Sequence, residues 1–473
     1  MRCYAVVLMI RVTDRVRARA WKIPARVTPP AIPAAASGAN NPFLAVSLAM
    51  GLGLLVVRFS MLNQMLYVLL NINPLLMYLF GIPTMVGVVL SGGIWRSFRG
   101  APAYYWTAYA LWMALVSPFS VWRSGSLPVV WGYWKVELPV LFVIAGLAIT
   151  WRSCRMVMYA IAWSGVLTVA AGKFFRDPSS DERLAITFGT VANANDYACV
   201  LLLMIPFLLW MALSSKKLAV RMVMLVAVAA GIYMIVSTGS RGAAVGLLAE
   251  MLFLLFRGSV RQRIALLTLG LGIVVLAVIV APKHLIDRIL SFSTEDRGSQ
   301  AEAAESMLLR QYTNQKALEY TLTHPITGVG PGQFSTYEGT HNTVVNQHGY
   351  WIDAHNSYLQ VSCETGLPGL LFFVGGFLST GYLLNKTYRK ARSRPDCADI
   401  QVAALCIMLG MTGYCVGIAF LNFAYFFYGP ALGGLAIAVR TAAEREFATR
   451  PVPAPGNPVL PVRTGSPKGR AWA

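Results

Sequence analysis

Repeated long runs of apolar residues constrain the fold of this chain more than any other feature. Many runs approach the length of about 20 residues that a helix needs to cross the hydrocarbon core of a bilayer. Hydrophobic residues make up 56% of the sequence, charged residues only 13%, and the mean hydropathy is +0.57. Because lipid cannot hydrogen-bond a backbone, apolar runs without strand-like alternation must cross as helices. The sequence therefore predicts an all-α, polytopic membrane protein.

The hydropathy pattern predicts about twelve transmembrane helices. Segment 59–73 is apolar but is interrupted by Asn63, Gln64, Asn71 and Asn73, so it is either interfacial or part of a kinked second helix. The predicted spans are 43–57, 74–91, 103–122, 136–150, 156–172, 197–213, 222–239, 242–256, 264–281, 365–384, 400–420 and 423–440.

The distribution of Lys and Arg predicts that both ends of the chain lie in the cytoplasm. In that orientation the inward loops and the two tails carry most of the basic residues, as the positive-inside rule requires. The net charge of +20 then belongs to an inner face against anionic lipid, and nucleic acid is not an expected partner. The predicted organisation is a disordered basic tail at 1–42, nine helices at 43–281, an outward loop at 282–363, three helices at 364–440 and a disordered tail at 441–473.

The outward loop 282–363 is the largest predicted segment outside the membrane, and it holds all five histidines. Its stretch 302–324 is compatible with a helix that ends at Pro325. The seven cysteines of the chain show neither a pairing pattern nor a CxxC motif, so no disulfide framework or thiolate metal site is expected. Chemistry is therefore expected in the loop.

Several motifs, taken together, resemble the O-antigen ligase family of bacterial inner-membrane glycosyltransferases, which includes polymerase-like proteins and protein O-oligosaccharyltransferases. They are STGSRG at 237–242, HPITGVGPGQF at 324–334 and AHNSYLQVSCETGLPGLLFF at 354–373. RLAITFGTVANANDYA at 183–198 is similar to the family's arginine, glycine and asparagine pattern before a helix, although Asn193-Ala194-Asn195 departs from the commoner Asn-Pro-Asn.

The resemblance implies transfer of a glycan from undecaprenyl diphosphate to an acceptor hydroxyl on the periplasmic side of the inner membrane. In such a reaction charge develops on the oxygens of a departing diphosphate, and fixed cations stabilise it. The donor is preassembled on lipid, so no nucleotide-sugar domain is needed, and the chain has neither a DxD motif nor a Gly-rich nucleotide loop. No metal or other cofactor is expected.

Arg241 stands between two apolar runs with very little loop around it. Position alone favours an ordinary interfacial arginine that extends toward lipid headgroups. However, Gly239 and Gly242 flank the turn and allow other groups to approach the backbone closely. Together with the family pattern, this favours a catalytic role for Arg241 at the donor diphosphate.

His355 is the histidine that directly precedes an apolar helix in the AHNSYL context. A lone loop histidine is more often structural, but an imidazole with a near-neutral pKa suits proton transfer from an acceptor hydroxyl. His355 is therefore the second predicted catalytic residue. Its neighbour Asn356 is predicted to bind substrate.

The resemblance also assigns substrate binding to Arg183, Arg310 and Asn195. A loop arginine is more often a solvated charge, so both roles stay open for the two arginines. Glu250 falls inside a predicted span, where an acid is a functional candidate, a partner of a neighbouring helix or a protonated side chain.

A zinc hydrolase is a poor alternative to a glycosyltransferase, and a secondary transporter is the more serious one. His341, His348 and His355 recur every seven residues, which does not match the HExxH motif of a zinc hydrolase. A secondary transporter would also suit twelve helices with an intramembrane acid. Within the enzyme class, the acceptor is a lipid A core, a growing polysaccharide or a protein, and ligation to lipid A core is preferred.

Overall fold

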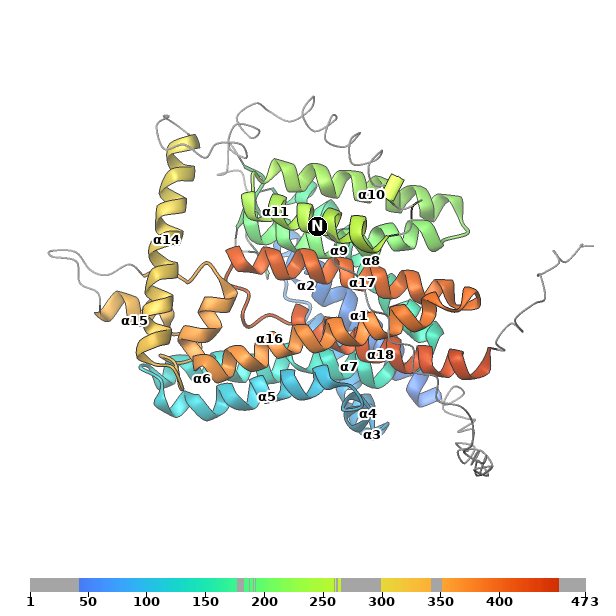
Figure 1. Cartoon of the computed structure of the whole chain (residues 1–473), viewed down its shortest axis with the longest axis horizontal. Helices are drawn as coiled ribbons and strands as arrows, with labels where there is room; N and C mark the ends of the chain where they lie inside the picture. The colour runs from blue at the N-terminus through green and yellow to red at the C-terminus, as the bar shows by residue number, and fades with distance from the viewer. Residues whose placement is uncertain are drawn as a thin grey trace, which may run out of the picture. The chain divides into compact units, whose positions relative to one another are not determined.

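The computed structural model describes residues 42–176, 183–186, 188–189, 191, 193–258, 260, 263–264, 299–341 and 351–450. Contacts divide the chain after Asn41, so all these residues belong to one compact unit (Figure 1). Every regular element in the described ranges is a helix, and none is a strand. This confirms the predicted all-α class.

The longer helices in chain order are α1 (Pro42–Ser60), α2 (Leu62–Leu70), α3 (Leu76–Leu90), α4 (Gly93–Ser97), α5 (Ala101–Val116), α6 (Arg123–Gly132), α7 (Pro139–Leu147), α8 (Trp151–Phe174), α9 (Ala194–Ser214), α10 (Leu218–Ser237), α11 (Arg241–Arg257), α14 (Ser299–Thr323), α15 (Phe334–His341), α16 (Ser357–Arg392), α17 (Ala398–Gly417) and α18 (Tyr428–Thr449). Short 3-10 turns are η2 (Ser117–Phe119), η4 (Pro395–Cys397) and η5 (Ile418–Phe420), and η3 (Tyr133–Glu137) is a π-helical turn between α6 and α7.

Seven helical stretches in the described part of the chain are long and apolar enough to cross a bilayer, by length and composition. They are Pro42–Ser60, Arg123–Leu147, Trp151–Phe174, Ala194–Ser214, Leu218–Ser237, Ser357–Arg392 and Pro395–Phe420. Helices α3, α5 and α11 overlap further predicted spans but have only 15, 16 and 17 residues. Helix α18 overlaps the last span and continues to Thr449 with several charged residues. The chain is a multi-pass membrane protein, and the predicted span 264–281 lies outside the described residues except for Ile264.

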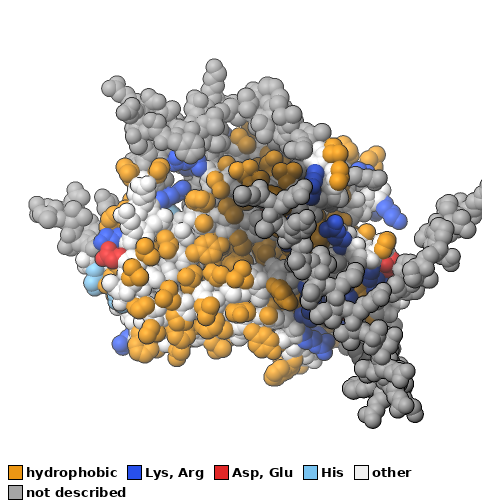
Figure 2. Space-filling view, in the orientation of Figure 1, with side chains coloured by type: hydrophobic (Ala, Val, Ile, Leu, Met, Phe, Trp, Pro, Cys, Tyr) orange, Lys and Arg blue, Asp and Glu red, His pale blue; other side chains and the backbone are white. Residues whose placement is uncertain are grey.

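Helix α9 lies at the centre of the bundle, between α8, α10 and α17. In the most apolar window of α9, 83% of the residues are buried, compared with 39% in α1 and α10. Helices with one exposed apolar face suit contact with lipid. Figure 2 shows hydrophobic side chains across the middle of the viewed face, while most visible Lys and Arg lie toward its left and right. This distribution fits a membrane-embedded middle with charged ends.

The ambiguous segment 59–73 forms a break followed by a separate short helix. Helix α1 ends at Ser60, Met61 adopts a left-handed conformation with φ of 58°, and α2 begins at Leu62. A non-glycine residue in this region of backbone space is uncommon, so the break has no sequence signature. Large apolar side chains are exposed along α2 and the following turn, namely Tyr67, Val68, Leu69, Leu70, Ile72 and Leu75. This exposure fits the interfacial alternative.

The stretch predicted as a span at 136–150 is part of a longer helical run that begins at Arg123. Arg123, Ser124 and Gly125 lower the hydropathy of its first turn, which explains why the apolar pattern begins later in the sequence. The run continues through the π-helical turn η3 into α7. Such turns are rare and often mark functional sites.

Helix α14 confirms the helix expected at 302–324, since it ends at Thr323 before His324 and Pro325. It stands across the ends of other helices and packs on the first part of α16 (Figure 1). A small core joins these elements, formed by Ala317, Tyr320, Val329, Phe334, Ala354 and Cys363. Within it, the buried carboxylate of Glu338 accepts hydrogen bonds from the hydroxyls of Tyr312 and Tyr320. These contacts fix α14 and α15 over the start of α16.

The Gly-rich segment 324–334 packs against a break in α16. Gly366 there has φ of 72°, and a Cβ on it would lie 2.1 Å from the carbonyl oxygen of Ile326. Two residues earlier, the buried Glu364 carboxylate accepts the backbone N–H groups of Gly332 at 2.9 Å and Phe334 at 3.1 Å. It also accepts the hydroxyl of Tyr425. Two motifs that are distant in sequence are therefore one packed structural unit, which holds α14 and α16 in place.

Candidate functional site

The turn between α10 and α11 presents Arg241 as the first residue of α11. Gly239 makes the turn possible because its φ of 57° is readily adopted by glycine. The Ser240 hydroxyl caps α11 by accepting the N–H of Ala243 at 3.3 Å. Gly242 is needed for close packing, since a Cβ there would lie 3.0 Å from the ring of Phe420. The STGSRG motif thus fixes a half-buried arginine at a helix N-terminus.

Arg183 is held against this turn and against the start of α9. Its Nε donates to the carbonyl oxygen of Thr238 at 2.8 Å, and its Nη2 donates to Oδ1 of Asn195 at 3.0 Å. The neighbouring N–H of Leu184 donates to the carbonyl of Ser237 at 3.0 Å. Two segments that the sequence analysis treated separately, 183–198 and 237–242, therefore meet through direct hydrogen bonds.

The Asn193-Ala194-Asn195 sequence begins α9 without the proline of the commoner motif. The Asn193 side chain is the N-cap, since its Oδ1 accepts the N–H groups of Asn195 at 2.8 Å and Asp196 at 3.1 Å. This cap leaves the Asn195 side chain to contact Arg183. The two asparagines therefore have different structural roles.

A small cavity brings these segments together with α14 and with the end of α17. It is lined by Asn195, Cys199, Ser240, Gly242, Ala243, Arg310, Gly417, Phe420 and Leu421. The residues on both sides of Arg241 line it, and so does the Asn195 partner of Arg183. Arg310 is contributed by α14. Two of the four predicted substrate-binding residues, Asn195 and Arg310, therefore line the same cavity, and Arg183 contacts one of them.

His355 lies just before α16, and hydrogen bonds join the start of this helix to the segment 418–423. Asn356, predicted to bind substrate, is the N-cap of α16, and its Oδ1 accepts the N–H groups of Tyr358 and Leu359 at 3.0 and 3.3 Å. The Ser357 hydroxyl donates to the carbonyl of Leu421 at 2.7 Å and accepts the N–H of Phe423. Because Leu421 also lines the cavity, these bonds position His355 relative to it.

The surroundings of His355 lower its pKa below the ordinary value of 6.5. Burial is the largest cause, the positive charge of Arg310 is the second, and the carboxylate of Asp353 acts in the opposite direction. Asp353 is itself held by the side-chain amide of Asn422 at 2.9 Å. This shift favours the neutral imidazole over the charged form, and Arg310, one of its causes, also lines the cavity.

The other histidines in the described residues have surface environments. The His341 ring stacks on Tyr337 with centroids 4.2 Å apart, and its Nδ1 lies 2.8 Å from the Thr340 hydroxyl. His324 lies 3.0 Å from the Thr323 hydroxyl through its Nδ1. His348 lies outside the described residues. Among the residues that were described, no group of three or more His, Cys, Asp or Glu is arranged to hold a metal ion.

Glu250 lies inside the helix bundle, on the inward face of α11. It is 5% exposed, and a Cβ on Gly413 of α17 would lie 2.1 Å from its Oε1. Within the described part of the chain this oxygen has no hydrogen-bond partner. A charged carboxylate in such a position is costly, so a neutral, protonated side chain fits the packing.

Sequence reasoning missed several residues that shape this region. Asp353 and Asn422 orient the segment before α16, and Phe420 packs on Gly242. Glu364 organises the Gly-rich segment, although it stands within the quoted 354–373 motif. An acid next to an otherwise apolar helix was the available signal for Glu364. The segment 418–423 has no comparable signal in the sequence.

Comparison with known families finds a match to the model described as O-antigen ligase over residues 226–374. The matched region includes Arg241, Arg310 and His355, while Arg183 and Asn195 precede it. No curated protein matches the chain. The match confirms the resemblance indicated by the motifs and supports a glycosyltransferase activity of the ligase or polymerase type.

Proposed function

We propose, from the premise that residues 226–374 are an O-antigen ligase domain, that the chain transfers a glycan from undecaprenyl diphosphate to an acceptor hydroxyl without a metal ion. One observation carries the proposal. The cavity is lined by residues from separate segments of the chain, among them Asn195, Ser240, Gly242 and Arg310. The positive charge of Arg310 also acts on His355. This supports a site in which cations for a diphosphate and a neutral base come from four separate segments of the chain.

The donor side of the reaction requires stabilisation of a departing diphosphate. The bond between the anomeric carbon and the phosphate oxygen breaks, and undecaprenyl diphosphate leaves with the electron pair. Arg241 lies at the N-terminus of α11, where the helix dipole also favours negative charge. Arg183 and Arg310 add cations from the adjacent loop and from α14. Preoriented cations of this kind stabilise the transition state more than the ground state because the diphosphate gains charge as it leaves.

The acceptor side of the reaction requires removal of a proton. In the proposed step the acceptor oxygen forms a bond to the anomeric carbon, and His355 takes the hydroxyl proton. A general base must be neutral, and the lowered pKa of His355 keeps it neutral at physiological pH. Asn356, as the helix cap, positions His355 by fixing the start of α16. We therefore assign Asn356 a positioning role in addition to its predicted proximity to substrate.

The proposed location is the bacterial inner membrane, with the cavity facing the periplasm. The distribution of Lys and Arg in the sequence supports this orientation. Lipid A core is the proposed acceptor. A growing polysaccharide or a protein hydroxyl would use the same donor chemistry, so these acceptors are alternatives within one mechanism.

The test uses the purified full chain in proteoliposomes with a labelled undecaprenyl-diphosphate glycan. Three acceptors are supplied separately: lipid A core, a second lipid-linked glycan and a protein substrate. The proposal expects label on lipid A core, release of undecaprenyl diphosphate and no loss of activity with EDTA. Transfer to another acceptor would keep the mechanism and change the acceptor. Solute uptake without glycan transfer would instead favour a transporter and overturn the proposal.

A further inference from the structure

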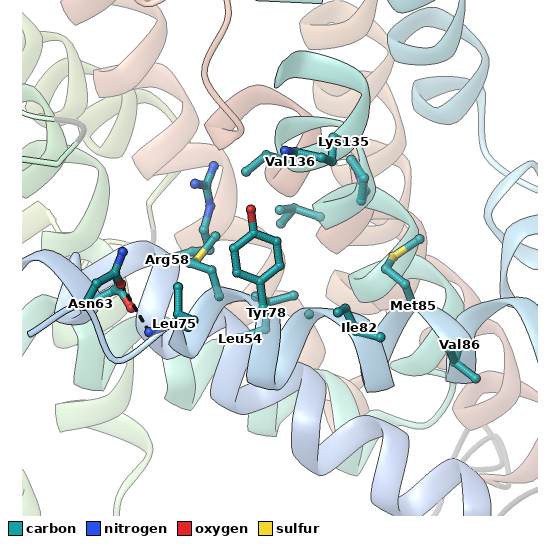
Figure 3. Close-up of a pocket in the computed structure, with 15 residues that line it drawn as sticks. Leu54, Arg58, Asn63, Leu75, Tyr78, Ile82, Met85, Val86, Lys135 and Val136 are labelled. Carbon is teal, nitrogen blue, oxygen red and sulfur yellow. Dashed lines mark hydrogen bonds between the residues drawn. The ribbon is translucent and has the colours of Figure 1, made fainter. Parts of the chain in front are cut away.

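A second cavity lies between α1, α3 and the η3–α7 region (Figure 3). Its lining residues precede those of the proposed site in the sequence. Its walls are mostly apolar and include Leu54, Ile82, Val86 and Val140. It has a volume of about 580 Å³, within the range of about 300 to 1,000 Å³ that is common for ligand sites. We call it the α1–α3 groove. The small cavity lined by Asn195 and Arg310 at the proposed site is called the Arg310 cavity. Among the described residues, the two cavities share no lining residue.

Polar groups converge at one end of the α1–α3 groove. Figure 3 shows the guanidinium of Arg58, the hydroxyl of Tyr78 and the ammonium of Lys135 directed toward the same space. Arg58 belongs to the last turn of α1 and Tyr78 to the first turn of α3. The exposed apolar residues of α2 and its following turn adjoin this end, so it lies at the level of a bilayer interface.

Contacts with neighbouring side chains hold Arg58 at this end of the groove. Its side chain is only 10% exposed, it pairs with Glu137 from η3, and its guanidinium carbon lies 4.5 Å from the ring centroid of Phe427. The Arg58 Nε has no hydrogen-bond partner among the described groups. This nitrogen is itself buried, while Figure 3 shows the Arg58 guanidinium directed into the groove, so Arg58 is a fixed cation at this end.

The charges at the groove match a single phosphodiester. Arg58 and Lys135 contribute two positive charges and Glu137 one negative charge, which leaves one positive charge in excess. A diester phosphate carries one negative charge, whereas a diphosphate carries more. The apolar walls are also partly open, since Tyr78 and Ile82 are 54% and 60% exposed. An acyl chain can therefore enter from the surrounding lipid.

We propose that the α1–α3 groove binds one anionic phospholipid of the bilayer, with its phosphodiester between Arg58 and Lys135 and an acyl chain along α1, α3 and α7. The headgroup is of the phosphatidylglycerol type. An ethanolamine headgroup would bring a further cation next to Arg58 and Lys135. The site differs from the proposed donor site in lining residues and in charge, so it does not depend on the transferase proposal.

The test measures lipid binding to the purified full chain by native mass spectrometry. Phosphatidylglycerol, phosphatidylethanolamine and undecaprenyl phosphate are added separately. One phosphatidylglycerol should bind more tightly than either other lipid. Lys135→Gln should weaken that binding about fivefold, the scale of one cation at an anionic lipid surface. Lys173→Gln, which removes an exposed lysine outside the groove, is the matched control and should bind normally.

A second pair of variants tests the groove by shape. A Cβ on Gly81 would have only Leu54 Cδ1 nearby, at 3.8 Å, so a larger side chain has space to enter the groove. Gly81→Phe should abolish the tight phosphatidylglycerol complex, whereas Gly81→Ala should retain it. Equal binding of all three lipids, equal loss in Lys173→Gln, or full binding by Gly81→Phe would overturn the proposal. Tighter binding of undecaprenyl phosphate would also overturn it and would assign the groove to the donor lipid.

Discussion

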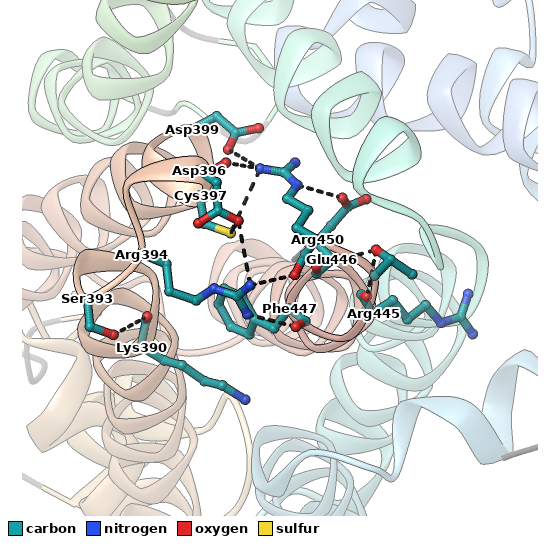
Figure 4. A network of polar contacts seen from close by, with 11 residues as sticks. Lys390, Ser393, Arg394, Asp396, Cys397, Asp399, Arg445, Glu446, Phe447 and Arg450 are labelled. Atoms are coloured by element: carbon teal, nitrogen blue, oxygen red, sulfur yellow. Dashed lines mark hydrogen bonds and ion pairs between the residues drawn. The ribbon is translucent and has the colours of Figure 1, made fainter. Parts of the chain in front are cut away.

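Two regions of the molecule are rich in arginine, and their arginines have different surroundings. Near the end of α18, Arg450 contacts Glu446 at 3.0 Å and Asp399 at 3.4 Å, while Arg394 contacts Asp396 at 3.6 Å (Figure 4). We call this group the carboxylate network. At the candidate site, Arg183 donates to a backbone carbonyl and to an amide oxygen, both of which are neutral.

We propose that arginine has a structural role in the carboxylate network and a catalytic role at the candidate site. In the carboxylate network, acids compensate the positive charges. Arg394 also joins the α16–α17 connection to α18 by donating to the carbonyl oxygens of Phe447 and Arg450. At the candidate site, the hydrogen bonds of Arg183 to Thr238 and Asn195 go to neutral oxygens, which orient its guanidinium. Oriented cations of this kind suit a substrate that brings its own negative charge.

The largest expected effect is that of Arg241→Ala. Loss of one preoriented cation at the leaving diphosphate should lower glycan transfer by about a hundredfold to a thousandfold. Arg241→Lys should recover part of the activity because it keeps the charge but loses the bidentate geometry. Rates are measured in proteoliposomes at equal amounts of folded protein. The matched control, Arg450→Ala in the carboxylate network, should lower the unfolding temperature slightly and leave the transfer rate unchanged. Equal transfer by both Ala variants would remove the distinction between the two regions.

His355→Ala should lower transfer by about a hundredfold, the scale of general base catalysis, while donor binding persists. His341→Ala is the control, because that histidine is exposed and stacks on Tyr337. It should retain nearly full activity. Both variants are assayed with and without EDTA. Loss of activity in both, together with inhibition of the unmodified chain by EDTA, would favour metal catalysis instead.

Asn195→Asp would give Arg183 a carboxylate partner, as the arginines of the carboxylate network have. The new carboxylate would accept from Arg183 at the same position as the amide oxygen does. We expect transfer to fall about tenfold, equivalent to about 1.4 kcal/mol of transition-state stabilisation, with no loss of thermal stability. Asn195→Ala is measured in parallel. An Asp variant as active as the unmodified chain would show that the charge near Arg183 is not used.

The smallest predicted effect is a displacement of the pH profile in Arg310→Gln. Arg310 is one cause of the lowered pKa of His355, so its neutralisation should raise that pKa toward 6.5. A base loses activity as the pH falls through its pKa, and the acid limb of kcat/KM should therefore move to higher pH. Asp353→Asn should move it to lower pH, because the Asp353 carboxylate raises the pKa of His355. If the acid limb of kcat/KM is unchanged in both variants, the group that titrates there is not His355.

The sequence was informative wherever a pattern was local. Apolar runs predicted the helices, and Pro325 predicted the end of α14. The STGSRG turn and the asparagines before α9 also lie where the sequence placed them, at helix starts. The physical reason is that hydropathy, capping residues and proline act over a few residues.

Features that depend on distant residues were not predictable from the sequence. The break at Met61 has no signature, because methionine rarely adopts a left-handed conformation. The contact of Glu364 with Gly332 and Phe334 joins segments that only the folded chain brings together. The same is true of Phe420 and Leu421 at the Arg310 cavity. Sequence motifs identified the participating segments, and tertiary packing determined which of them meet.

The most direct test of the central claim is a double-mutant cycle on Arg241 and His355. The claim is that residues from α11 and from the start of α16 act on one transferred glycan. The kcat/KM for an undecaprenyl-diphosphate glycan is measured for Arg241→Ala, His355→Ala and the double variant. Residues that act as a unit give strongly non-additive losses, so the double variant should be little worse than the more damaged single variant. Losses that multiply independently, or single variants with full activity, would contradict the account.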